Sequence, residues 1–88
     1  MKMMIVIIRD IDDDTVTHAL TAAQFRITRI ASTGGLLKRG NNTLLIGLED
    51  EKVDQAMQII YNKCSPSPSP EIRRATIFVL NINEQIRF

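Results

Sequence analysis

The sequence predicts an α+β fold in which two helices cover one face of a four-stranded antiparallel sheet. Two observations predict it. Short apolar runs typical of strands alternate with longer segments whose apolar residues recur at helical spacing, and the order strand, helix, strand occurs twice along the chain. The chain has 88 residues, enough for one modest hydrophobic core. We therefore expect a single domain that spans residues 1–88.

The first strand and the first helix are expected near the N-terminus. The apolar run from Met3 to Ile8 lacks alternation, which is typical of a central strand covered on both faces. A helix from about Asp12 to Ala23 follows, because apolar residues recur on one helical face: Val16, Ala19, Leu20 and Ala23. Acidic residues suit a helix start, so Asp12 is predicted as the N-cap, with Ile11 and Val16 packed across it as a hydrophobic staple.

A second strand is expected from Phe25, where the apolar period changes to two. Phe25 and Ile27 would then lie on one face of the strand, and Arg26 and Thr28 on the other. Ile30 breaks the alternation, which indicates either a bulge or a second face that is also covered.

The connection from Thr33 to Asn42, before a third strand at Thr43 to Leu48, is longer than a hairpin requires, since hairpin loops have about two to five residues. Its glycines, Gly34, Gly35 and Gly40, would permit positive φ and let backbone N–H groups approach a ligand closely. Lys38 and Arg39 add positive charge, and Asn41 and Asn42 at its end carry amides suited to a base edge. It is not a P-loop, because the Gly-x4-Gly-Lys-Ser/Thr pattern is absent. The composition indicates an anion-binding or nucleotide-binding loop; a flexible surface hairpin with solvated charges is the alternative.

The second half of the chain repeats the pattern of the first. Asp50 and Glu51 open a second helix, whose apolar face comprises Val53, Ala56, Met57 and Ile60. The segment Cys64 to Pro70, CSPSPSP, is expected to be a short, stiff connector, because its prolines lack N–H donors. A last strand is expected from Arg74 to Ile82. The resulting order, β-α-β-β-α-β, is that of ferredoxin-like domains.

One apolar face of the sheet is expected to lack a helical cover, since two helices cover only one face. The last strand is largely apolar on both faces, with Ile77 and Val79 on one and, on the other, Thr76, Phe78, Leu80 and Ile82. A contiguous patch of this kind usually marks an interface, so we expect a closed homo-oligomer. The alternative is that the C-terminal segment 83–88 folds over this face.

Composition and charge exclude several classes of function. The net charge of +1 provides no general surface for a nucleic acid polymer. Cys64 is the single cysteine and cannot form an internal disulfide, which favours a reducing compartment. The run from Met3 to Ile8 is too short to span a membrane, and no signal-peptide cleavage site follows it. We therefore expect a cytoplasmic protein without membrane association.

The titratable residues form no catalytic or metal-binding set. His18 is the only histidine and is expected at the surface or boundary of the first helix, so no metal site is predicted. Cys64 follows Ile60 by four positions, which favours packing at the end of the second helix over a role as nucleophile. The acidic run from Asp12 to Asp14 is interpreted as a helix start. We expect neither an enzyme nor a cofactor.

Three segments carry a resemblance to a known family: MKMMIVIIRDID, FRITRIASTGGLLKRGNNTLLIGLEDEKVDQA and ATIFVLNINEQIRF. The most specific part is Phe25-Arg26-x-Thr28, followed by Thr33-Gly34-Gly35-x-Leu37 and Gly40-Asn41-x-Thr43. Together these segments resemble the PII-like cyclic-di-AMP receptor proteins of Gram-positive bacteria, from Met1 to about Cys64 and again from Ala75 to Phe88.

This resemblance implies a ferredoxin-like homotrimer of the PII superfamily, without enzymatic activity, that holds cyclic di-AMP in clefts between subunits. It also implies signal transduction by docking on a target protein, which the sequence does not identify. The long connection would hold the nucleotide, and the apolar sheet face would form the trimer interface. The ligand-binding positions that the resemblance implies are Gln24, Arg26, Thr28, Gly35, Leu36, Leu37, Asn41, Gly47, Phe78 and Arg87.

The chain departs from the family pattern at some of these positions. Where the family typically has Asn, Phe and Gln, this chain has Gln24, Leu36 and Arg87. The family's long loop before the last strand is shortened to CSPSPSPEIRR, and Arg73, Arg74 and Arg87 would favour a more anionic ligand. Two functions remain: a receptor that binds cyclic di-AMP or a related nucleotide, and a divergent trimeric interaction module that has lost nucleotide binding.

Overall fold

The computed structural model of the chain describes residues 1–30, 40–83 and 86. Its elements follow the order β-α-β-β-α-β, so the prediction of a ferredoxin-like α+β fold is confirmed. The elements are β1 (Lys2–Arg9), α1 (Asp10–Ala22), β2 (Arg26–Ile30), β3 (Asn41–Leu48), a 3₁₀ turn (Asp50–Lys52), α2 (Val53–Lys63) and β4 (Ala75–Asn81).

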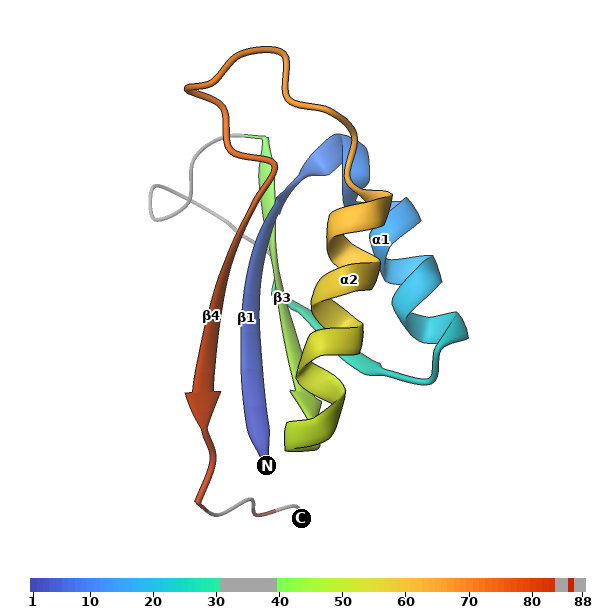
Figure 1. The fold of residues 1–88 in the computed structure, drawn as a ribbon, viewed down its shortest axis with the longest axis vertical. Helices are drawn as coiled ribbons and strands as arrows, with labels where there is room; N and C mark the ends of the chain where they lie inside the picture. Colours follow the sequence, from blue (N-terminus) through green and yellow to red (C-terminus); the bar gives the residue numbers. More distant parts are fainter. Residues whose placement is uncertain (31–39, 84–85, 87–88) are drawn as a thin grey trace.

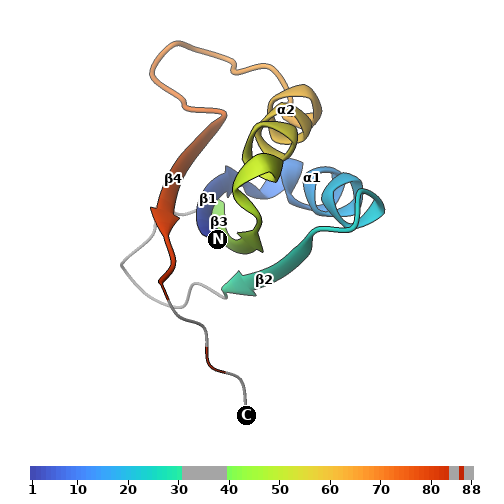
Figure 2. The ribbon, with the colours of Figure 1, turned by 60° about the horizontal axis from the view of Figure 1, so that its bottom comes forward.

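The four strands form one antiparallel sheet in the order β2-β3-β1-β4, and both helices lie on the same face of it (Figure 1). β1 is internal, as its unbroken apolar run predicts, while β2 and β4 are the two edges. The register aligns Ile5 of β1 with Leu45 of β3 on one side and with Phe78 of β4 on the other. Residues 64–74 connect α2 to β4 in a wide arch (Figure 2).

The hydrophobic core lies between the helices and the sheet. Along β1, Met4, Val6 and Ile8 are at most 1% exposed, and they alternate with residues of the opposite face. The helices contribute the apolar stripes predicted from the sequence, through Val16, Leu20, Ala56 and Ile60. Met57, predicted on the same stripe of α2, is instead 40% exposed, because it borders a groove between α2 and β4.

The start of α1 differs from the prediction. The helix begins at Asp10, its N-cap position is Arg9, and no side chain caps it. Asp12 is therefore not the N-cap but lies within the first turn, where its carboxylate is 99% buried and hydrogen-bonded to other segments. Ile11 is 72% exposed, so the predicted hydrophobic staple is also wrong. Partners distant in the sequence determine the orientation of these side chains.

The end of α1 requires a left-handed residue, and Gln24 occupies that position with a φ of 70°. The N–H of Gln24 donates to the carbonyl of Thr21 at 2.9 Å, and that of Phe25 donates to the carbonyl of Leu20 at 3.0 Å. This pair of bonds is the Schellman arrangement that closes many helices. It turns the chain directly into β2, with Phe25 entering the core.

The face of the sheet away from the helices, called the open face below, is apolar and partly exposed. Phe78 and Leu80 of β4 are 52% and 48% exposed, as expected for side chains that no helix covers. Val79, on the helix side of β4, is also 41% exposed, because the helices leave this edge strand partly uncovered. Of the C-terminal segment 83–88, the structure describes Asn83 and Ile86, and Ile86 is itself 67% exposed.

Candidate functional site

Predicted ligand-binding positions of β2 and β3 lie on the open face. Side chains alternate along β2, so Arg26 and Thr28 are exposed whereas Phe25 is buried and Ile27 partly buried. The register pairs Arg26 with Gly47 of β3. This alternation was predicted from the sequence, and the strand pairing adds Gly47 to the same corner.

Two rows of residues cross the open face from β2 to β4. One row consists of Arg26, Gly47, Met3 and Leu80, and the next consists of Thr28, Leu45, Ile5 and Phe78. Each row begins with a polar side chain at the β2 edge and ends with an apolar side chain at the β4 edge. Three strand spacings, about 14 Å in all, separate the two ends. Arg26 and Phe78 thus lie at opposite edges of the open face of one chain.

A hollow of about 510 Å³ extends along the outer edge of β2, and both Arg26 and Thr28 border it. Its other lining residues come from α1 and β2: Thr17, Thr21, Phe25, Ile27 and Arg29. The Arg26 guanidinium gives this edge positive charge, and the hydroxyls add hydrogen-bond donors, whereas the Arg29 guanidinium is paired with Asp13. In combination with an apolar floor, these groups suit an anionic ligand that carries flat rings.

Glycines open the backbone on the β3 side of this region. Gly47 is exposed, and a Cβ built there would meet only the end of the Met1 side chain, at 3.6 Å. Packing of the fold therefore does not require a glycine here, and its absent side chain leaves the backbone accessible beside Arg26. Gly40, directly before β3, has a φ of 89°, which favours glycine.

The remaining predicted ligand-binding positions lie in different parts of the fold. Asn41 opens β3 on the open face, opposite Arg9 of β1. Gln24 is exposed at the end of α1, two positions before Arg26 in the chain. The structure thus brings Arg26, Thr28 and Gly47 together at the β2 side. Asn41 lies at the opposite end of β3, and Phe78 lies at the far edge of the sheet. Four predicted positions lie outside the described residues: Gly35, Leu36, Leu37 and Arg87.

Asp13 joins the ends of β2 and β3 from the helix side of the sheet. Its Oδ1 accepts hydrogen bonds from Arg29 Nη2 at 2.7 Å and Thr17 Oγ1 at 2.9 Å, and its Oδ2 accepts one from the Asn42 amide. The carboxylate is 93% buried. Since Arg29 follows Thr28 and Asn42 follows Asn41, Asp13 fixes the neighbours of two predicted ligand-binding residues.

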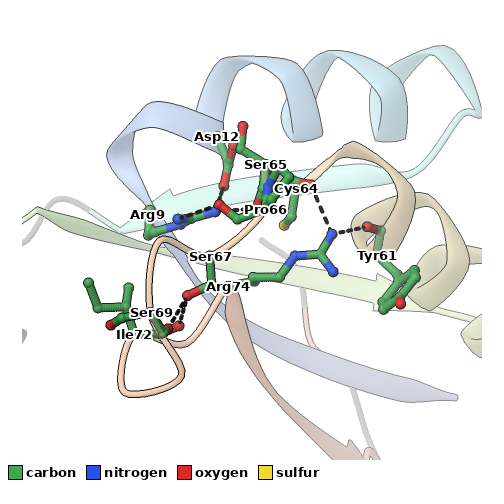
Figure 3. Close-up of polar contacts among 10 residues, drawn as sticks. All are labelled: Arg9, Asp12, Tyr61, Cys64, Ser65, Pro66, Ser67, Ser69, Ile72 and Arg74. Carbon is green, nitrogen blue, oxygen red and sulfur yellow. Dashed lines mark hydrogen bonds and ion pairs between the residues drawn. The ribbon is translucent and has the colours of Figure 1, made fainter.

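Asp12, the adjacent carboxylate, holds a different segment (Figure 3). It accepts hydrogen bonds from the Ser65 N–H and from Arg9 Nη2, both at 2.9 Å. The Arg9 guanidinium also donates to the carbonyls of Ser65 and Pro66. The first turn of α1 thus fixes the connector through Asp12 and the ends of β2 and β3 through Asp13.

These roles of Asp12 and Asp13 were missed in the sequence, where the acidic run was interpreted as a helix start. Adjacent carboxylates at that point are compatible with either role. What distinguishes them is a cationic or amide partner from a distant strand or loop, such as Arg29 or Asn42. A usable signal was the run of three acidic residues from Asp12 to Asp14, which follows Asp10 and Ile11 and is longer than capping requires.

Burial and hydrogen bonding act in opposite directions on these two groups. Burial alone would raise the pKa of Asp12 and Asp13, but the hydrogen bonds they accept outweigh it and hold both pKa values below the ordinary 3.8. Because their pKa values are lower in the folded state, the two ionised carboxylates stabilise the folded protein at pH values above the unfolded-state pKa. This contribution is lost as the pH falls through the folded-state pKa.

We therefore expect the free energy of unfolding to decrease as the pH falls below about 4. The D12N/D13N double variant should be less stable at neutral pH and show a weaker decrease, as measured by urea denaturation at a series of pH values. D14N is the control, because the Asp14 side chain in the same turn is fully exposed. Equal pH slopes for the wild type and the double variant would contradict this account.

Other candidate groups have structural roles or none. His18 is exposed on α1, as predicted. Cys64 is 6% exposed at the end of α2, and burial, reinforced by the charge of Asp12, raises the pKa of its thiol, which disfavours the nucleophilic thiolate. Within residues 1–30, 40–83 and 86, no group of His, Cys, Asp or Glu side chains is arranged to hold a metal ion. Neither described helix is long and apolar enough to cross a membrane.

Comparisons with known proteins identify both the family and the fold. A family model described as cyclic-di-AMP receptor matches residues 1–69. Among solved structures, the chain is similar to a functionally unknown protein from Pediococcus pentosaceus ATCC 25745, with 30% sequence identity and a TM-score of 0.79. That similarity covers 99% of this chain and 96% of the other. It therefore extends through β4, beyond the part that the family model matches.

Proposed function

Because the chain belongs to the cyclic-di-AMP receptor family, we propose that it is a PII-like signalling protein that binds cyclic di-AMP, or a closely related nucleotide, in clefts between the subunits of a homotrimer. The observation that carries this proposal is the arrangement of the open face, with Arg26 and Thr28 at one edge and Phe78 at the other. Packing of copies through this face would bring the β2 edge of one subunit near the β4 edge of the next.

The chemistry of these positions fits a cyclic dinucleotide. Arg26 supplies a guanidinium for a phosphate, and Thr28 a hydroxyl that can donate or accept. The exposed backbone at Gly47 and the amide of Asn41 suit the polar edges of a base, and Phe78 offers a ring surface for stacking. We include Gln24, Gly35, Leu36, Leu37 and Arg87 in the proposed site on the basis of the family resemblance.

The proposal includes neither a reaction nor a cofactor. Signalling would occur through docking on a target protein in the cytoplasm. A selective thermal shift tests the proposal directly: cyclic di-AMP at about 100 times its Kd should stabilise the folded protein by about 2.7 kcal/mol. Cyclic di-GMP and ATP at the same concentration should leave the midpoint unchanged. An equal shift with all three nucleotides, or none with cyclic di-AMP, would contradict the proposal.

In the proposed function, Asp13 positions the backbone that carries two of the ligand-binding residues. Its hydrogen bonds to Arg29 and Asn42 fix the backbone at Thr28 and Asn41, whose side chains lie on the opposite face of the sheet. The N–H of Asp10 in the same turn donates to the carbonyl of Gly40 at 2.8 Å, which adds a second link to the start of β3. Loosening these links would misplace two of the proposed ligand contacts.

We expect D13N to weaken the binding of cyclic di-AMP about tenfold, because an amide provides one acceptor oxygen where Asp13 uses two for three donors. D12N is the matched control. It changes a buried carboxylate in the same turn, but one that holds the connector. Both variants should lose similar stability in urea, while only D13N should change the affinity measured by titration. Equal affinities for D12N and D13N would exclude the positioning role.

A further inference from the structure

A groove of about 530 Å³ lies on the helix side of the sheet, between α2, the connector 64–74 and the start of β4. Three large apolar side chains that border it are at least 40% exposed: Met57 and Tyr61 of α2 and Ile72 of the connector. Small-molecule sites typically have volumes of about 300–1,000 Å³ and mostly apolar walls. The groove, named the α2–β4 groove below, has both properties, and it lies apart from the proposed nucleotide site on the open face.

Hydrogen bonds fix the connector that forms the rim of this groove (Figure 3). Asp12 accepts a hydrogen bond from the Ser65 N–H, and Arg9 donates one to the Ser65 carbonyl. Further along, the Ser67 hydroxyl lies within hydrogen-bonding distance of the Ile72 carbonyl. Alternating prolines restrict the backbone between these points. The rim is therefore preformed, which lowers the entropic cost of binding.

The lining of the groove carries positive charge. Arg73 and Arg74 contribute to it, and none of the described lining residues is Asp or Glu. Arg74 Nη2 donates to the carbonyls of Tyr61 and Cys64 at 2.8 and 2.9 Å, and its guanidinium lies 4.7 Å from the centre of the Tyr61 ring, so this cation is fixed in the groove wall. Arg73 is exposed beside it. A carboxylate forms strong hydrogen bonds with guanidinium groups and would therefore complement this lining.

Binding in this groove does not require a free outer edge on β4. The strand contributes Ala75 and Ile77, whose side chains lie on the helix side and pack against the core. A ligand between α2 and the connector would contact these side chains, whereas a neighbouring subunit in the proposed assembly would lie along the backbone of the outer edge. The groove and the proposed contact between the β2 and β4 edges thus use different parts of β4.

We propose that the α2–β4 groove is a second ligand site, which binds a small aromatic carboxylic acid. The aromatic body would fill the space between Met57, Tyr61 and Ile72. Its carboxylate would accept hydrogen bonds from Arg73 and Arg74. All of these residues belong to one chain, so the site does not depend on the proposed nucleotide binding.

Two probes of the same shape test this proposal on the full chain: cinnamate, which carries a carboxylate, and cinnamamide, which carries an uncharged amide. In NMR titrations of the isotope-labelled protein, cinnamate should shift the backbone amides of Tyr61 and Ile72 saturably, and cinnamamide should bind much more weakly. R73E should weaken the binding of cinnamate about fivefold. I72D should weaken it about tenfold, because it removes part of the apolar wall and repels the carboxylate.

Two matched controls separate the groove from general surface effects. K63E reverses a charge near the end of α2 outside the groove lining, and I11D places a carboxylate at a 72% exposed position of α1. Neither should change the affinity for cinnamate. The proposal fails if cinnamate does not bind, if cinnamamide binds equally well, or if R73E behaves like K63E. Saturable shifts confined to Ile5 and Phe78 would also overturn it, because they would place the probe on the open face.

A monomeric variant tests whether a neighbouring subunit fills the groove. I5D places a carboxylate at the centre of the open face and should separate the subunits. It should bind cinnamate as tightly as the wild type does, because every residue of the site comes from one chain. Binding by I5D but not by the wild type would mean that a neighbouring subunit occupies the groove, and would overturn the proposal. Cyclic di-AMP should not compete with cinnamate, so a failure of the proposed nucleotide binding leaves this test intact.

Discussion

Replacing Arg26 with alanine should weaken the binding of cyclic di-AMP about 100-fold or more. Arg26 stands at the β2 edge of the open face beside Gly47, where its guanidinium is the described positive charge best placed to meet a phosphate between subunits. Removing one partner of a desolvated charge pair costs about 2–5 kcal/mol, and each 1.4 kcal/mol corresponds to tenfold in affinity. Titration calorimetry with cyclic di-AMP measures the loss.

Two further variants sharpen this prediction. R26K keeps the charge but loses the planar pair of donors, so its affinity should lie between those of the wild type and R26A. R73A removes an exposed arginine from the helix side of the sheet and should bind as the wild type does. Size-exclusion chromatography should give the same assembly for all three. An R26A variant that retains wild-type affinity would remove Arg26 from the site.

Introducing a carboxylate at the centre of the open face should dissociate the assembly. Ile5 lies between Leu45 and Phe78 in the register, at the middle of the row that joins the two sheet edges. An unpaired carboxylate buried there costs several kcal/mol in each subunit. We expect I5D to sediment as a monomer in analytical ultracentrifugation and to lose nucleotide binding, because the site then lacks its second subunit.

The I5D monomer should remain folded, since Ile5 points away from the core that Met4 and Val6 fill. Far-ultraviolet circular dichroism should therefore match that of the wild type. I11D is the matched control, because it places the same charge on an exposed position of α1 and should leave the assembly intact. If I5D and the wild type have the same mass in solution, the open face is not the interface.

Local patterns predicted the elements of this fold well. Alternation at Phe25 to Thr28 and the apolar stripes of both helices are short-range signals, and, apart from Met57, they led to the correct face of the correct element. The order of elements followed from these signals, and the order in turn predicted an apolar face without helices. Phe78 and Leu80, about half exposed on the open face, bear out this expectation.

Contacts between distant segments were not predictable in the same way. Asp12 and Asp13 suited a helix start, yet their partners lie at Ser65, Arg29 and Asn42, and nothing local in the sequence indicates these pairings. The exposure of Met57 has the same origin, because it depends on how far α2 lies from β4. The groove between α2 and β4 that Met57 borders was missed for the same reason.

The candidate site was predicted in two different ways. Alternation placed Arg26 and Thr28 on one face, and the paired strands now add Gly47 beside Arg26. The positions of Asn41 and Phe78 in the site depended on the family resemblance, and their place in a shared cleft remains a proposal. Gln24 illustrates a limit of pattern reasoning: a left-handed backbone at the end of α1 explains its position without reference to a ligand.

Isothermal titration of the purified wild-type chain with cyclic di-AMP tests the central claim most directly. The account predicts saturable binding with about one ligand per subunit, because each interface pairs one β2 edge with one β4 edge. Cyclic di-GMP and ATP should give no saturable heat. The contradicting result would be a folded homo-oligomer in which cyclic di-AMP produces no binding heat over a range of temperatures. The chain would then have the fold of the family without binding its ligand, and the proposed function would be wrong.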